Sequence, residues 1–242
     1  MKTKIVITDL TRMQQGRVCL AGYDETHTCI RPVLPPPGIP EKSLVRDHKS
    51  LVFPFAVIEI DLLRPNPKPP HTEDHFFDPD SLTYIRQVQD RRSVLKWSLF
   101  DSVEKIFEQP ILHKPGYYVM DCQGLRSLGT IKPANIFKIT YIQGDEGNWD
   151  YHLIFYDGED IRYRLKITDL TWQYYCRSLR SEEREPDKIA AELTEQLKKC
   201  EVYLRIGLAR GWNEFPDRCY LQITGIFTFP DYLGGKHFYD FC

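Results

Sequence analysis

The sequence lacks the features that mark membrane and exported proteins. No run of apolar residues approaches the about 18 that a membrane-spanning helix needs, so we predict no contact with a membrane. The opening MKTKIVITDL is basic and then apolar, but its apolar run is too short for a signal peptide and is broken by Asp9. We therefore expect a cytoplasmic protein whose first residues form a strand.

Motifs of common catalytic classes are missing as well. The chain contains no GxSxG, no GxxxxGK[ST] and no GxGxxG, so it offers neither a nucleophile elbow nor a glycine-rich phosphate loop. No CxxC pair occurs, and the seven cysteines are scattered over positions 19, 29, 122, 176, 200, 219 and 242. We interpret them as reduced and mostly buried. These absences predict a protein that is not an enzyme and that needs no cofactor.

A large net charge is also absent. Lys and Arg total 32 against 34 Asp and Glu, a formal charge of −2, so any nucleic-acid surface must be a local patch. Residues 1–70 carry a mild basic excess, with ten Lys or Arg against seven Asp or Glu. This excess fits an ordinary solvated surface as well as it fits a binding patch.

The residues that are present favour a β-rich fold. Hydrophobic residues make up 42% of the 242 residues, which is enough for a packed core in one large domain or two small ones. Alternating patterns predict strands over residues 4–10, 17–23, 28–33, 55–63, 117–120, 134–142, 151–156, 160–167, 202–208 and 219–229. Helical periodicity predicts helices over 81–88, 99–107 and 186–200. The pair Asp157-Gly158 predicts a type I′ turn.

The spacing of these elements suggests two similar halves. Each half has about five strands and a helix, which favours a pair of small β-barrels over one layered α/β domain. Residues 125–129 (LRSLG) resemble a linker. We therefore expect a mainly β protein with a few helices and a boundary near residue 128. Residues 1–128 would form one barrel with a helical insertion, and residues 129–242 a second barrel with one helix.

The word ITDLT occurs twice, at residues 7–11 and 167–171. The repeat does not extend beyond these five residues, so it indicates a shared local structure more than a duplicated fold. In both copies an apolar strand end leads into Thr and Asp side chains that can accept hydrogen bonds from backbone N–H groups. We predict that each copy ends a strand and starts a turn or helix, and that Asp9 and Asp169 have structural roles.

Longer words carry a resemblance to a known family. They are RVCLAGYD with the following CIRPV, FAVIEIDLLRP with the later HTED, and in the second half KITDLTW, RIGLARGW and CYLQITGIF. With these words the chain resembles the bacterial dual-OB domain proteins over nearly its full length. The resemblance implies two tandem OB-like barrels. It also implies nucleic-acid binding and a place in a bacterial defence or conflict system, such as antiviral defence.

An OB barrel holds a single strand by stacking bases on aromatic side chains and by following the phosphates with basic ones. The candidate contacts are Arg12, Arg17, Arg31, Arg46, Lys49, Arg210 and Trp212, with Arg218 and Tyr220 close behind. Trp212 could equally cover the end of a barrel. The implied function is a non-catalytic nucleic-acid-binding module, for DNA or RNA, that acts with protein partners as a subunit of a larger defence complex.

Two alternatives stay open. The near-neutral charge fits a protein-interaction subunit that never contacts nucleic acid, and the tail YLGGKHFYDFC could supply an aromatic plug for a partner. A metal-dependent nuclease could use Glu59 and Asp61, which share a strand face, with the segment HTEDH. His71 and His75 of that segment lie four positions apart, but in a predicted loop without further ligands nearby, so we expect no metal there.

Overall fold

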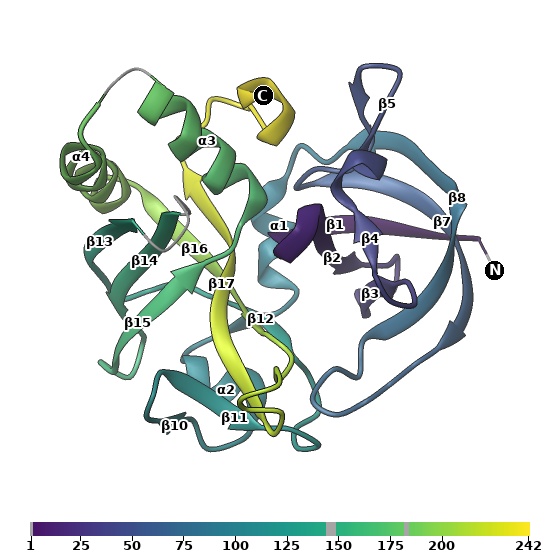
Figure 1. Ribbon diagram of the computed structural model, residues 1–242, viewed down its shortest axis with the longest axis horizontal. Helices are drawn as coiled ribbons and strands as arrows, with labels where there is room; N and C mark the ends of the chain where they lie inside the picture. The colour runs from purple at the N-terminus through teal and green to yellow at the C-terminus, as the bar shows by residue number, and fades with distance from the viewer. Residues whose placement is uncertain (1, 144–148, 182–183) are drawn as a thin grey trace.

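The computed structural model describes residues 2–143, 149–181 and 184–242, and two β-sheets lie side by side in it (Figure 1). The first sheet contains β1 (Lys2–Arg12), β2 (Arg17–Tyr23), β3 (Cys29–Val33), β4 (Ile39–Pro40), β7 (Ala56–Pro65) and β8 (Asp74–Gln87). A separate hairpin consists of β5 (Val45–Arg46) and β6 (Lys49–Ser50). The second sheet contains β9 (Leu99–Phe100), β10 (Leu112–His113), β11 (Tyr117–Met120), β12 (Leu128–Ile131), β13 (Asn135–Gln143), β14 (Trp149–Tyr156), β15 (Arg162–Ile167), β16 (Glu201–Leu208) and β17 (Arg218–Phe229).

The first sheet closes into a barrel. Its five main strands follow the order β1-β7-β8-β3-β2, and β2 pairs again with β1. Only β3 and β8 run parallel; the other pairs are antiparallel. Alternate residues such as Ile5, Ile7, Ile58 and Ile60 point into the core and are almost fully buried. This is the closed, five-stranded OB-type arrangement, and closure removes the unpaired strand edges that favour aggregation.

The second sheet has the same strand pattern but is completed by a helix. Its five main strands follow the order β13-β14-β15-β17-β16, with one parallel pair among them, β15 and β17, and the sheet continues from β16 to β12 and β9. Helix α4 (Pro186–Lys198) packs against β13, and the Thr194 hydroxyl accepts a hydrogen bond from Ile139 N at 2.9 Å. The helix thus occupies the side of β13 that faces away from β14. The predicted fold, mainly β with two OB-like barrels, is confirmed.

Short elements connect the two sheets. Helix α1 (Arg91–Lys96) lies between them in sequence, and helix α2 (Val103–Phe107) follows β9, with its buried side in the core of the second barrel. The strands of the two sheets therefore separate between Gln87 and Leu99, whereas the domain boundary near residue 128 stays a prediction. Among the described residues, no helix combines the length and apolar character needed to cross a lipid bilayer.

A buried ion pair joins the two barrels. Arg205 of β16 is fully buried, and its guanidinium donates to both carboxylate oxygens of Asp9 of β1, at distances from 2.8 to 3.2 Å. The same guanidinium donates through Nη1 to the hydroxyls of Tyr23 at 2.8 Å, Ser98 at 2.7 Å and Thr130 at 3.0 Å. Asp9 therefore has a structural role, as predicted, because its charge neutralises a cation of the other barrel inside the protein.

The two ITDLT copies contact each other. Arg12 N donates to the carbonyl oxygen of Thr168 at 2.9 Å, and Thr11 forms a bridge with Asp169. In the second copy the Asp169 carboxylate accepts from the backbone N–H groups of Thr171 and Trp172, at 2.8 and 3.2 Å, where helix α3 (Leu170–Ser181) begins. Burial raises the pKa of Asp169 to about 7 against the opposing effect of these hydrogen bonds.

The first copy differs from the prediction. Strand β1 continues through all five residues and ends at Arg12, just before the turn η1 (Gln14–Gly16), so this copy lies at a strand end but its aspartate caps no helix. The physical reason is the partner of its aspartate: Asp9 binds the buried Arg205 side chain and is not available to cap backbone N–H groups. The same five residues therefore have two local structures, set by what lies opposite each of them.

Two of the helix predictions are corrected by strand pairing. Residues 81–88, predicted as helical, lie mostly in β8, where Thr83 pairs with Glu59 and Tyr84 with Ile58. Residues 99–107 begin with the short strand β9, which pairs in parallel with β12, and only then form α2 after the N-cap Ser102. In both cases pairing with a distant strand outweighs the local periodicity. The helix predicted over 186–200 is confirmed as α4.

Two other local predictions also fail. A type I′ turn needs positive φ at both central residues, but in the loop after Asp157 only Asp160 has it, at 59°. Gly158 is needed there for a different reason, since a Cβ at this position would lie 2.2 Å from the carbonyl oxygen of Asp101. All seven cysteines are free as predicted, but only Cys176 and Cys219 are buried.

The C-terminal tail packs on its own chain. Phe238 is 2% exposed, belongs to the core of the first barrel and contacts Tyr174 of α3 with ring centroids 5.8 Å apart. The short helical turn η4 (Phe238–Phe241) thus covers the junction of the barrels. Phe238, which the tail could have offered to a partner, is therefore buried against its own chain.

Candidate nucleic-acid interface

Aromatic and arginine side chains gather at one end of the second barrel. We call this the aromatic–arginine surface; it consists of Tyr118, Arg210, Trp212, Phe215, Arg218 and Tyr220. Trp212 is 47% exposed and stacks on Tyr220, with ring centroids 4.7 Å apart and planes inclined by 29°. Phe215 meets Trp212 edge to face at 5.8 Å. The exposed indole therefore lies on a fixed aromatic base.

Arg218 extends this surface toward β11. Its guanidinium carbon lies 4.4 Å from the ring centroid of Phe215 and 4.8 Å from that of Tyr118. Tyr118 reaches this place because β11 pairs with β17, which sets Tyr118 opposite Tyr220 with ring centroids 5.5 Å apart. An arginine between two rings is held by cation–π attraction while its remaining N–H groups can still donate.

The loop between β16 and β17 positions Trp212. Gly211 is required in this loop, since a Cβ there would lie 2.2 Å from the carbonyl oxygen of Pro216. The turn is closed by Phe215 N, which donates to the carbonyl oxygen of Trp212 at 2.9 Å. The segment joins the fourth and fifth strands of the barrel, and in OB folds this is one of the loops that bind oligonucleotides.

Arg210 connects this loop to the first barrel. It forms an ion pair with Asp74 at the start of β8, and the same carboxylate accepts from Arg31 Nε at 2.6 Å. Arg210 is half exposed, whereas Asp74 and Arg31 are buried. Burial, helped by Arg31 and Arg210, lowers the pKa of the neighbouring His71 to about 2, so His71 stays neutral.

The family described as the dual OB-containing domain matches residues 3–226. The chain belongs to the dual OB-containing domain family. Among solved structures it is similar to "Structure and Conformational Change of a Replication Protein A Heterotrimer Bound to ssDNA", with 11% identity and a TM-score of 0.39. That match covers 93% of this chain and 49% of the other, so this chain spans about half of the other's length. The comparison with curated proteins gives no match.

Within this family fold, the predicted contact residues lie in different places. Arg210 and Trp212 belong to the aromatic–arginine surface. Arg12 is exposed at the end of β1, 5.8 Å from the ring centroid of Tyr174. Arg46 and Lys49 are exposed on the β5–β6 hairpin, and Arg17 is partly buried at the start of β2. Arg31 is only 4% exposed and its Nε donates a hydrogen bond to Asp74, so in this structure it stabilises the fold.

Two residues of the surface were missed from the sequence, Tyr118 and Phe215. Strand 117–120 was predicted correctly, and it carries two adjacent tyrosines. The local sequence does not show which strand pairs with β11, since β11 and β17 are separated by about a hundred residues. Only their pairing brings Tyr118 beside Tyr220.

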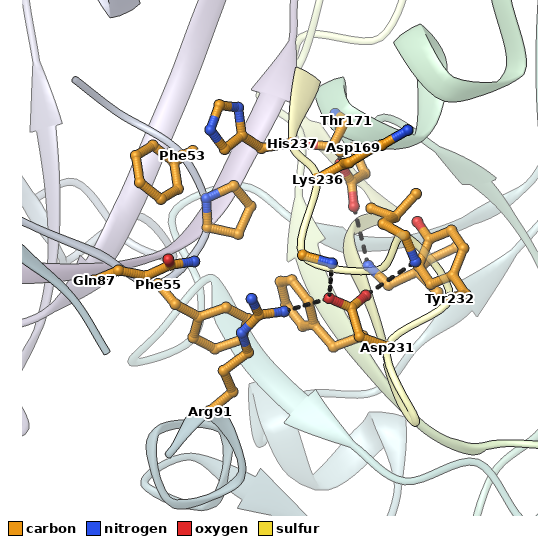
Figure 2. Close-up of a pocket in the computed structure, with 15 residues that line it drawn as sticks. Phe53, Phe55, Gln87, Arg91, Asp169, Thr171, Asp231, Tyr232, Lys236 and His237 are labelled. Carbon is orange, nitrogen blue, oxygen red and sulfur yellow. Dashed lines mark hydrogen bonds and ion pairs between the residues drawn. The ribbon is translucent and has the colours of Figure 1, made fainter. Parts of the chain in front are cut away.

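A separate pocket lies where the two barrels meet (Figure 2). Phe53, Phe55 and Arg91 reach it from the first half of the chain, and Asp231 and Tyr232 from the second. Arg91 Nη1 donates to Asp231 Oδ2 at 2.6 Å, and the Asp231 carboxylate also accepts from the backbone N–H groups of Leu233 and Gly235. These charged groups are satisfied by each other, so the pocket stabilises the junction of the barrels.

The residues of the nuclease alternative are not gathered into one site. Glu59 forms an ion pair with Lys2 at 3.6 Å, and the His75 imidazole contacts the carbonyl oxygen of Glu73 at 3.0 Å. His71 is buried with its Nε2 3.9 Å from the sulfur of Cys219. Over the part of the chain that the structure describes, no group of three or more His, Cys, Asp or Glu is placed to hold a metal ion.

Proposed function

We propose that the chain binds single-stranded nucleic acid across the aromatic–arginine surface of the second barrel. The observation that carries this proposal is the exposed Trp212, stacked on Tyr220 and followed by Arg218 between two further rings. Every nucleobase has a π-face, so a base can stack on the free face of the indole whatever its sequence. Arg218 and Arg210 supply donors for the phosphates on either side.

The charge distribution supports a local site of this kind. The whole chain carries a formal charge of −2, so non-specific attraction to a polyanion is weak, and binding must come from a few placed groups. In the aromatic–arginine surface both charged side chains are arginines. Arg210 shares its partner Asp74 with Arg31, which leaves the group of three a net charge of +1. A phosphate beside Arg210 would therefore meet a net positive charge from these three side chains, with the exposed carboxylates of Glu214 and Asp217 in the same loop acting against it.

The test is fluorescence anisotropy with labelled oligothymidylate and the matching oligouridylate. We expect Trp212→Ala to weaken binding by about 5- to 150-fold, because base–aromatic stacking contributes about 1–3 kcal/mol per base. Arg218→Gln should lower the slope of log affinity against log salt by about 0.7, the value for one phosphate contact on a single strand.

Phe137→Ala is the matched control. Phe137 lies on β13 and is 48% exposed, nearly the same as Trp212, but it is not part of the surface. Its removal should leave the affinity unchanged. Equal losses in both variants, or no binding by the unaltered protein at low salt, would show that the aromatic–arginine surface is not a nucleic-acid site.

The finer function implied by the resemblance also remains a proposal. According to this proposal, the chain is a non-catalytic subunit of a larger bacterial defence complex and acts beside protein partners in the cytoplasm. Its support is the dual-OB resemblance and the absence of a catalytic motif from the sequence. Recovery of the chain from its host in one stable assembly with nuclease or helicase subunits would support this role, and recovery only as a single chain would argue against it.

A further inference from the structure

An apolar groove of about 440 Å³ opens on the first barrel. One wall is formed by β4 and the residues before it, where Leu34 and Ile39 line the groove together with three prolines at positions 35, 37 and 40. The opposite wall is formed by Phe77, Pro79 and Leu82 of β8. This wall protrudes because residues 79–82 form a bulge opposite β7, between the pairs Asp61–Asp78 and Glu59–Thr83.

The groove is rigid and offers almost no hydrogen-bonding groups. Prolines have a fixed φ and no N–H donor, so four of them in the walls keep the opening preformed and apolar. Only two lining residues have polar side chains, Arg17 and Ser43, and the Ser43 hydroxyl already donates to the carbonyl oxygen of Pro40. The groove therefore selects carbon-rich groups.

Arg17 is the single charged residue that lines this groove. Its Nε is buried and has no hydrogen-bond partner among the described residues. A buried guanidinium N–H without an acceptor is costly, and a carboxylate is the acceptor that matches its planar fork best. Outside the lining, Lys42 is balanced by the carboxylates of Glu41, Asp78 and Asp80, so the guanidinium of Arg17 is the charge that the groove itself presents. The groove thus combines apolar walls with one cationic side chain.

We propose that this groove binds a segment of a partner protein in which a large apolar side chain stands next to a carboxylate. The apolar side chain enters between Leu34 and Leu82, and the carboxylate accepts from Arg17. A nucleobase fits poorly, because most of its polar edge would face apolar walls and Phe77, the only aromatic side chain among the described lining residues, is 3% exposed. The site lies on the other barrel from the aromatic–arginine surface and does not depend on it.

The experiment measures fluorescence anisotropy of a short labelled peptide that alternates Leu, Phe and Asp. A matched peptide carries Lys in place of Asp. The unaltered protein should bind the Asp peptide and not the Lys peptide. Arg17→Glu should weaken the Asp peptide by about 10- to 100-fold, since a hydrogen bond to a charged group contributes about 1.5–3 kcal/mol, and it should gain affinity for the Lys peptide.

Two further variants separate docking from a general loss of structure. Leu34→Glu, at a half-buried wall position, should abolish binding of the Asp peptide, and Arg46→Glu, on the β5–β6 hairpin, should leave that binding unchanged. Melting curves confirm that each variant is folded. The swap of peptide preference in Arg17→Glu cannot arise from misfolding, because it requires a gain of binding.

Three outcomes would overturn the proposal. The first is no binding of the Asp peptide to the unaltered protein. The second is equal binding of that peptide to Arg17→Glu. The third is displacement of the peptide by oligothymidylate together with weaker oligonucleotide binding in Arg17→Glu, which would make the groove a nucleic-acid site.

Discussion

The buried pair of Arg205 and Asp9 gives the most direct test of how the two barrels are joined. Replacing Arg205 by Met keeps an unbranched apolar stem but removes the guanidinium. The Asp9 carboxylate would then stay buried with only the hydroxyls of Thr8 and Thr224 as side-chain donors. Removing one partner of a buried ion pair costs about 3–5 kcal/mol, because an uncompensated charge remains inside.

The loss should appear in both chemical and thermal unfolding. For a protein of this size, about 1 kcal/mol corresponds to about 2–4 °C, so Arg205→Met should melt about 6–20 °C below the unaltered protein. The matched control is Arg92→Met. Arg92 also pairs with a carboxylate, Glu201 at 3.0 Å, but its side chain is half exposed, and exposed pairs contribute only about 0–1 kcal/mol.

A double variant separates charge from packing. In Arg205→Met with Asp9→Asn both charges are gone, while the hydroxyls of Tyr23, Ser98 and Thr130 can still bond to one another. The double variant should therefore be about 1–3 kcal/mol more stable than Arg205→Met alone in urea unfolding, and with Asp9→Asn as the other single variant the cycle gives the coupling energy of the pair. If Arg205→Met unfolds like Arg92→Met, or if the double variant regains nothing, the ion pair does not join the barrels as we reason.

Two further predictions concern pH and the C-terminal tail. Because the pKa of His71 is about 2 in the folded protein and near 6.5 when unfolded, the unfolded chain binds the extra proton between these values. His71 should thus contribute a loss of stability as the pH drops below 6.5, about 2 kcal/mol at pH 5, against the opposite contribution of Asp169, whose pKa is raised to about 7. In urea unfolding, the stability of His71→Gln relative to the unaltered protein should therefore rise by about that amount between pH 6.5 and pH 5, whereas the exposed His48→Asn should follow the unaltered protein. Phe238→Ala should cost about 3–5 kcal/mol in thermal unfolding because it empties a core site, whereas the exposed Cys242→Ser should melt like the unaltered protein; equal melting of the two would mean that the tail is not part of the fold.

The strands were predictable because alternation is a local property. Strands 17–23 and 117–120 match β2 and β11 to the residue, and the amphipathic helix over 186–200 is α4. In each of these segments the side chains that must be buried recur with the period of the element itself. Arg210 and Trp212 of the β16–β17 loop could also be chosen from the sequence as candidate nucleic-acid contacts, because they adjoin strong strand patterns.

The elements that were predicted wrongly are those whose structure depends on strand pairing. Residues 81–88 have helical spacing of Leu82, Ile85 and Val88, yet β8 runs beside β7 through most of them, so that Leu82 is buried and Ile85 exposed. The register of β8 depends on its pairing with β7, some twenty positions earlier in the chain. A short window of sequence therefore cannot predict it. The same holds for Tyr118, whose place in the aromatic–arginine surface depends on its pairing with Tyr220.

By itself the sequence predicted most of the long strands, although not β8, and the two OB-like barrels. Only the tertiary structure decided the role of each charged residue. Asp9 and Asp169 stand in identical words, but one neutralises Arg205 and the other starts a helix. Arg31 and Arg210 share one carboxylate, but only Arg210 is half exposed. The physical reason is that the effect of a charge depends on its burial and on its partners, and both come from residues distant in the chain.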